Sequence, residues 1–271
     1  MSRIFALSAI TFREGIRNRS LFGILLFSLF ILGLNIAIAG FFMRDIGKVS
    51  SDMNLSALSF AGLLLVLFVG INLMAKDIEK KTVHLVLSKP ISRVEYIWGK
   101  FLGIQLFVTI SLVFLLIFSW GTMFLLYHLY PEYFGRFSWA VFFLACFFIL
   151  VKLSVLNAIV IFFSTITTSS FITLIFSICI YITGVSIDDV VFYLRSQLAS
   201  EGVAASPALH RIIDFISYVI PNFSMFDFKL EAAHGLNISW YRIGVSLGYG
   251  LAYEVLLLIF AACIFMRREF N

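Results

Sequence analysis

Residues 75–103 read AKDIEKKTVHLVLSKPISRVEYIWGKFLG. They form the only long charged segment that lies between two strongly apolar runs on the side that the charge distribution, described below, assigns to the cytoplasm. The part from Thr82 to Ser88 is short and amphipathic, and Pro90 ends it because proline lacks the backbone N–H that a helix needs. Ser92 and Glu95 have the S-x-x-E spacing of a capping box, in which each side chain accepts a hydrogen bond from a free backbone N–H. The sequence therefore predicts a short helix, a break and a second helix that begins at Ser92.

The composition around this segment is that of an integral membrane protein. Of the 271 residues, 61% are hydrophobic and only 13% are charged, whereas about a quarter of the residues in a soluble domain are charged. The net charge of +5 fits basic loops that contact anionic headgroups, so we expect membrane lipids and no nucleic acid as partners. The sequence has no phosphate-binding P-loop, no catalytic motif and no His or Cys cluster at metal-ligand spacing, so we expect no catalysis and no bound cofactor or metal in this chain.

Six apolar runs are long enough to cross a bilayer, which takes about 20 helical residues. We expect the spans at 20–42, 56–75, 101–127, 137–163, 170–187 and 243–266. Before the first span, residues 1–19 combine four arginines with an apolar face, a pattern typical of an interfacial elbow helix. The alternative is an ordinary basic N-terminus that orients the first span. The predicted fold class is all-α, with one transmembrane domain over residues 1–271.

Lysine and arginine are divided unevenly between the two sides of these spans. Residues 1–19, 76–100 and the end of the chain hold twelve of them, whereas the two short loops on the opposite side hold three. The positive-inside rule then places both termini and the 76–100 segment in the cytoplasm. We expect a multi-pass protein of a bacterial or archaeal inner (plasma) membrane.

The segment 188–242, between the last two spans, is expected to lie outside and to be helical. Asp188-Asp189 can cap one helix, and Ser206-Pro207 has the pattern of an N-cap followed by proline at the first helical position. The apolar stripes of these helices would lie at the outer leaflet or pack against a second subunit.

Two charges fall inside the predicted spans, where each costs at least a few kcal/mol at the bilayer centre. Lys152 and Glu254 lie at similar depths in spans that are entered from the same side. We expect them to pair or to meet across a dimer, either lining a substrate path or fixing the helix registry as a buried ion pair. Lys152 has a third option, which is contact with water or backbone carbonyls.

Residues 76–103 resemble the coupling loop between the second and third spans of type-2 ATP-binding-cassette (ABC) permeases. That loop has the pattern T-x-x-L-x-L-S-x-P-x-S-R-x-E followed by G-K-F-L-G. The matching residues here are Thr82, Leu85, Leu87, Ser88, Pro90, Ser92, Arg93, Glu95 and 99–103. Residues 220–223 and 226–229 resemble the Nos-type branch of that family, named for permeases associated with the maturation of multicopper enzymes.

The resemblance implies the non-catalytic permease subunit of an ATP-driven transporter that exports or extrudes its substrate. It also implies a homodimer, or a pair with a similar permease, together with two ATPase subunits that hold ATP and Mg. A periplasmic accessory protein is a further expected partner.

By the same resemblance, residues 76–100 receive the force of ATP hydrolysis. The apolar insert into the ATPase cleft would consist of Val83, Leu85, Val86 and Leu87. The charged rim of that insert would be Asp77, Glu79, Lys80, Lys81, Lys89 and Arg93. The bend that carries the insert would be shaped by Thr82, Pro90, Ser92 and Glu95.

A proton- or ion-coupled secondary carrier is the alternative function, with Lys152 and Glu254 as the coupling pair. Against it, the six spans show no clear inverted repeat and no matching pair of broken spans. For the 76–100 segment, the alternative is an ordinary cytoplasmic loop with basic charge and a helix cap.

Overall fold

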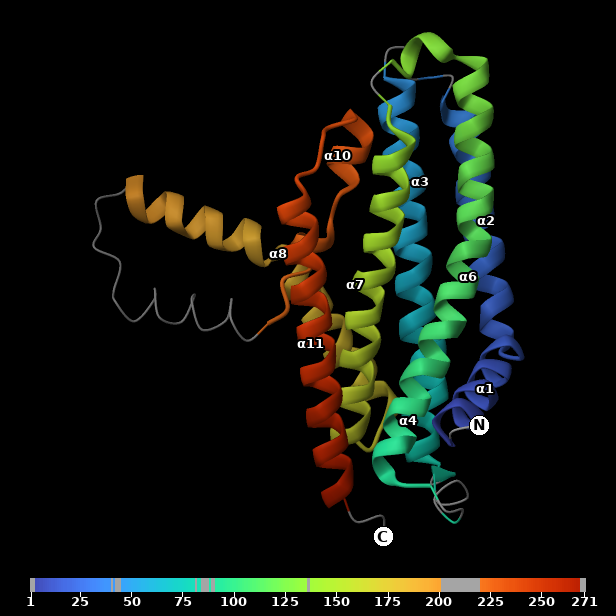
Figure 1. Cartoon of the computed structure of the whole chain (residues 1–271), viewed down its shortest axis with the longest axis vertical. Coiled ribbons are helices and arrows are strands. Elements are labelled where there is room, and N and C mark those ends of the chain that lie inside the picture. The colour runs from blue at the N-terminus through green and yellow to red at the C-terminus, as the bar shows by residue number, and fades with distance from the viewer. Residues whose placement is uncertain are drawn as a thin grey trace.

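The computed structural model describes residues 3–39, 41, 45–80, 82–83, 88, 91–135, 137–200 and 220–268. Within these ranges the protein consists of helices and connections, with no strand. The elements are α1 Arg3–Ile16, α2 Arg19–Ala39, α3 Ile46–Leu64, η1 Leu65–Gly70, α4 Ile71–Glu79, α6 Arg93–Leu129, η2 Pro131–Tyr133, α7 Trp139–Ile166, α8 Ser170–Ser200, η3 Phe223–Phe226, α10 Lys229–His234 and α11 Trp240–Arg267. Helices α2, α3, α6, α7 and α11 run side by side in a bundle, whereas the last part of α8 projects sideways from it (Figure 1).

Six helices in the described part of the chain are long and apolar enough to cross a membrane. They are α2, the continuous helix made of α3, η1 and α4, then α6, α7, α8 and α11. The predicted number of spans and the all-α class are therefore confirmed.

The second span is longer than the apolar run that predicted it. The helix begins at Ile46 and continues to Glu79, whereas the apolar run covers only 56–75. Its middle part, η1, is wound as a π-helix. The extra turns at the N-terminal end of α3 carry Lys48, which pairs with Asp45 at 2.9 Å and keeps about half of its side chain exposed. Charged residues thus continue the helix beyond the apolar layer.

The centre of the bundle is formed by α3, η1, α4 and α7, most of whose residues are buried, together with one face of α6. In the apolar, membrane-spanning stretches of α2, α8 and α11, most residues are not buried within the protein. These three helices therefore present apolar side chains outward, to lipid or to a second copy.

Helix α1 packs across the base of α6, and two glycines let it approach closely. A Cβ at Gly99 would lie 2.7 Å from Leu7 Cδ2, and a Cβ at Gly103 would lie 2.8 Å from the backbone oxygen of Ser8. The G-K-F-L-G motif thus forms a flat strip on which α1 rests. By contrast, Gly244 and Gly248 have open space where a side chain would be.

In the fifth span, α8, the structure differs from the sequence-based expectation. Helix α8 runs through Asp188 and Asp189 without a break, so the prediction that a new helix is capped there is wrong. Because α8 is already helical before these residues, its amides bond to preceding carbonyls and need no cap. The predicted start at Ser206-Pro207 lies outside the described residues.

Candidate functional site

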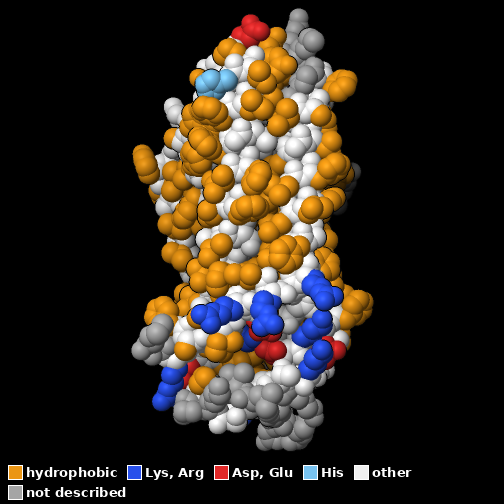
Figure 2. All heavy atoms as spheres, turned by 90° about the vertical axis from the view of Figure 1, so that its right-hand side faces the viewer, with side chains coloured by type: hydrophobic (Ala, Val, Ile, Leu, Met, Phe, Trp, Pro, Cys, Tyr) orange, Lys and Arg blue, Asp and Glu red, His pale blue; other side chains and the backbone are white. Residues whose placement is uncertain are grey.

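The connection between α4 and α6 lies at the same end of the bundle as the first turn of α1 and the last turn of α11 (Figure 1). Basic side chains gather in a band near this end, below a surface that is mostly hydrophobic (Figure 2). The exposed arginines of this region include Arg13, Arg17 and Arg19. Such a band suits the phosphate layer of a membrane.

Only part of the predicted coupling segment is described. The following predicted residues lie outside the described ranges: Lys81, Leu85, Val86, Leu87, Lys89 and Pro90. Lys80 and Thr82 are exposed. Val83 is 0% exposed, so in this structure it is not presented to a partner as the predicted insert requires.

The predicted capping box is present at the start of α6. The Ser92 hydroxyl accepts a hydrogen bond from the Glu95 amide at 3.2 Å, and the Glu95 carboxylate accepts one from the Ser92 amide at 2.7 Å. Two backbone N–H groups that have no partner within the helix are satisfied in this way. The direction in which the connection enters α6 is thereby fixed.

Lys100 is the buried centre of this end of the bundle. Its side chain is 4% exposed, and its ammonium lies 2.6 Å from the Asp77 carboxylate and 3.7 Å from Glu14. It also donates to the Leu73 carbonyl at 2.8 Å. One ammonium therefore joins α1, α4 and α6, and Asp77 additionally accepts from the Thr82 hydroxyl at 3.1 Å.

Glu79, the last residue of α4, caps a different helix. Its carboxylate accepts hydrogen bonds from the Ser170 amide at 3.1 Å and from the Ser170 hydroxyl at 2.5 Å. Ser170 is the first residue of α8, where backbone amides lack helical partners and a negative charge is favourable. The end of the second span is thus bonded to the start of the fifth.

Two arginines bind the carbonyl ends of neighbouring helices. Arg93, at the start of α6, donates to the carbonyls of Phe265 and Met266 at 3.0 Å and of Arg268 at 2.7 Å. These carbonyls lie at the end of α11, where the last helical carbonyls lack intrahelical amide partners.

Arg268 repeats this arrangement at the end of α7. Its guanidinium donates to the carbonyls of Thr165 at 2.8 Å and Thr167 at 2.9 Å. Partial burial lowers the pKa of Arg268 from its ordinary value, but an arginine begins so far above neutral pH that it stays charged. A fixed positive charge at a helix C-terminus is stabilising.

We call these residues, Asp77, Glu79, Arg93, Lys100 and Arg268, the basal network. Its bonds connect α1, α4, α6, α7, α8 and α11. Asp77, Glu79 and Arg93 were predicted to form a charged rim for a partner, but the structure places their charged groups against the chain's own helices. In the sequence, Lys100 has a place in the G-K-F-L-G motif and Arg268 a place among the cytoplasmic positive charges, but no pattern indicates the partners of either residue.

Comparison with known families agrees with this architecture. The sequence profile of the ABC-2 family transporter proteins matches residues 5–270, nearly the whole chain. The chain belongs to the ABC-2 transporter family. A comparison with curated protein sequences gives no significant match. Membership of this family makes the chain the membrane component of a transport system and implies association with ABC ATPase subunits.

In this ABC-2 protein the two intramembrane charges do not pair within one chain. Glu254 of α11 accepts a hydrogen bond of 2.5 Å from the Ser154 hydroxyl of α7. The Lys152 ammonium lies instead 5.1 Å from the ring centroid of Tyr181 on α8. Among the described residues, neither charge takes part in an ion pair, so the predicted pairing within the chain is wrong.

Helix geometry explains the difference. Residues 152 and 154 are about 200° apart around α7, so they face different neighbours. Helix α11 packs on the face that carries Ser154, whereas Lys152 faces α8. Lys152 and Glu254 were expected to meet because they lie at similar depths, but Lys152 is on the side of α7 that does not contact α11.

Proposed function

We propose that this chain is the permease subunit of an ABC exporter, and that the connection between α4 and α6 transmits force from cytoplasmic ATPase subunits. The basal network is the observation that supports this proposal. It bonds the helices on both sides of the connection to α1, α8 and α11, and Arg268 in turn bonds the end of α11 to α7. A push on the connection would therefore reach most of the bundle at once.

The partners follow from the family and from the exposed surfaces. Two ATPase subunits, with ATP and Mg, would bind at the end that holds the basal network. A second permease copy would cover apolar faces of α2, α8 or α11. In this arrangement both termini would lie in the cytoplasm of a bacterial or archaeal cell, as the positive-inside rule predicts from the sequence.

The direction of transport and the Nos-type branch rest on sequence resemblance alone. Leu85 and Leu87, outside the described residues, remain the sequence-based candidates for the apolar contact with the ATPase. Lys80 and Thr82 are exposed beside them in the chain and complete that surface.

Co-purification tests the proposal. The chain, extracted in mild detergent, should bring down an ABC ATPase, and Leu85→Glu with Leu87→Glu should abolish that association. Arg93→Gln should leave the association intact and lower the rate of ATP hydrolysis by the complex, because the start of α6 is no longer tied to α11. Arg267→Gln, an exposed neighbour at the end of α11, is the matched control.

The results that would refute the proposal are equally definite. An intact permease complex without an ATPase would exclude an ATP-driven transporter. Transport that persists after deletion of every associated ATPase would favour a secondary carrier. The absence of a Lys152–Glu254 contact within the chain already removes one basis for that alternative.

A further inference from the structure

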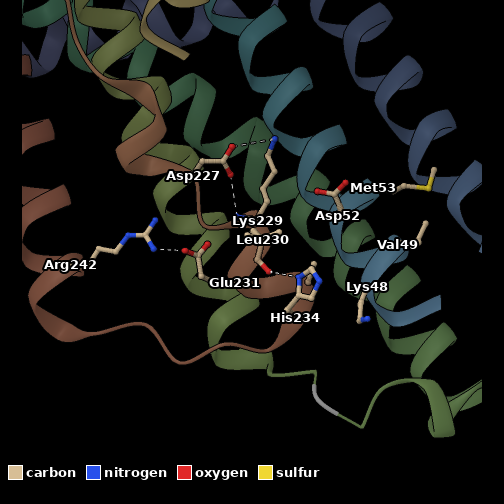
Figure 3. A pocket seen from close by; sticks show the side chains of 11 residues that line it. Lys48, Val49, Asp52, Met53, Asp227, Lys229, Leu230, Glu231, His234 and Arg242 are labelled. Atoms are coloured by element: carbon tan, nitrogen blue, oxygen red, sulfur yellow. Dashed lines mark hydrogen bonds and ion pairs between the residues drawn. The ribbon is translucent and has the colours of Figure 1, made fainter. Parts of the chain in front are cut away.

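A cavity of about 690 Å³ opens at the end of the bundle opposite the basal network. It lies between the first turns of α3, the segment that leads into α10, and the start of α11 (Figure 3). Its volume is within the usual range of small-molecule sites. The charged residues that line it are Lys48, Asp52, Asp227, Lys229, Glu231 and Arg242.

The walls of this cavity are held in place by the fold. Asp227 accepts a hydrogen bond from the Lys229 amide at 3.1 Å and so orders the start of α10. Gly235 ends α10 with a φ of 62°, a left-handed conformation that glycine adopts without strain. Ser246 of α11 donates to the Met225 carbonyl at 2.9 Å, which ties the preceding segment to the bundle. The cavity is therefore preformed.

The cavity is lined by equal numbers of acidic side chains and of lysine and arginine side chains, but not every one of them has a close partner of opposite charge. Arg242 is paired with Glu231, and Lys48 is paired with Asp45 at 2.9 Å. The Lys229 ammonium is held only loosely, 3.9 Å from the Asp227 carboxylate.

Asp52 is the acid that remains available. In the part of the chain that the structure describes, its exposed carboxylate has no ion pair and no hydrogen bond. Figure 3 shows Asp52 on α3 facing the same opening as Lys229. An available acid and a weakly held base from two elements are complementary to a ligand that carries both charges.

Aromatic and apolar residues indicate the depth of the cavity in the membrane. Trp240 and Tyr241, next to Arg242 at the start of α11, are 85% and 82% exposed. Exposed Trp and Tyr at a helix end are typical of the headgroup layer. Leu230 and Met53 also line the cavity, and Leu230 is well exposed. The opening thus offers charge on one side and apolar surface on the other.

We propose that this cavity binds the zwitterionic headgroup of a phospholipid from the leaflet at this end, with a primary ammonium at Asp52 and the phosphate at Lys229. A purely anionic ligand would meet three carboxylates, and a purely cationic one would meet three bases. An amphiphile with both charges satisfies the lining and places its glycerol and chains against Leu230. This site is independent of the ATPase contact, so either proposal can fail alone.

Native mass spectrometry of the full-length chain in detergent tests the site. The probes are phosphatidylethanolamine, phosphatidylglycerol and soluble glycerophosphoethanolamine. Phosphatidylethanolamine should bind about fivefold more tightly than phosphatidylglycerol, a difference suited to a partly exposed charge-assisted contact. Asp52→Asn should bring the two lipids to equal affinity, and Ala233→Trp, which fills the cavity, should weaken both.

Asp189→Asn is the matched control, because Asp189 is an exposed acid on α8 that does not line the cavity. It should keep the preference of the wild-type chain. Equal binding of the two lipids to the wild-type chain, or an unchanged preference in Asp52→Asn, would overturn the proposal. These two measurements decide the matter even if Ala233→Trp does not fold. Displacement of the lipid by equimolar glycerophosphoethanolamine would overturn the lipid assignment in favour of a soluble zwitterion.

Discussion

Replacing Lys100 with methionine removes the ammonium that joins α1, α4 and α6 while keeping a side chain of similar length. The Lys100 side chain is 4% exposed and its Asp77 partner is 21% exposed, so water reaches the acid only in part. The Leu73 carbonyl also loses its donor at 2.8 Å. The variant therefore leaves the Asp77 carboxylate without its counter-ion and removes the side-chain donor of the Leu73 carbonyl, in a mostly buried place.

The expected loss in the free energy of unfolding follows from these two changes. An unsatisfied buried acceptor costs about 1–3 kcal/mol, and removing one member of a fully buried ion pair costs about 3–5 kcal/mol. Because Asp77 is partly hydrated and keeps its bond from Thr82, we expect a total of about 2–4 kcal/mol. For a chain of this size that corresponds to a fall in Tm of roughly 5–10 °C.

Thermal unfolding in detergent, followed by tryptophan fluorescence, measures this change. Lys76→Met is the control, since Lys76 is an exposed base in the last turn of α4, the helix that carries Asp77. Adding Asp77→Asn to Lys100→Met removes the stranded charge and should restore part of the lost Tm. Equal Tm values for Lys100→Met and Lys76→Met would refute the reasoning. Failure of Asp77→Asn to restore any stability would show that packing, and not charge, holds this site.

Three further outcomes are expected. Gly103→Ala should destabilise the protein by about 1–3 kcal/mol, because its new Cβ would press on α1, whereas Gly121→Ala faces open space and should not lower the Tm. Glu79→Gln should speed hydrogen exchange at the first amides of α8 by about threefold to tenfold, measured by mass spectrometry, because a charged cap is replaced by a neutral one; unchanged exchange would contradict the cap. Glu254→Gln keeps an acceptor for the Ser154 hydroxyl, so the free energy of unfolding, measured from thermal unfolding, should fall by less than the contribution of one hydrogen bond, about 1 kcal/mol. A larger fall would show that the charge itself is structural.

The sequence predicted those features that depend on neighbouring residues. Six apolar runs gave six spans because the bilayer sets a minimum length for each one. The Ser92–Glu95 cap was predictable since both of its hydrogen bonds close within one helical turn.

The features that were missed depend on packing between distant segments. The carbonyls that Arg93 binds are more than 170 residues away in the chain, and no local pattern marks them. Lys100 looked like one more cytoplasmic charge until the structure placed α1 against Gly99 and Gly103. The six-residue helix α10 is too short to give a periodic signal.

The π-wound turn in the middle of the second span, Leu65–Gly70, has a consequence for movement. A π-turn accommodates about one residue more than an α-turn, so rewinding it to α geometry would rotate everything beyond it by about 100° around the helix axis. That rotation would withdraw the Asp77 and Glu79 carboxylates from their partners on α6 and α8. The contacts of Asp77 with Lys100 and of Glu79 with Ser170 therefore oppose any change in the winding of Leu65–Gly70.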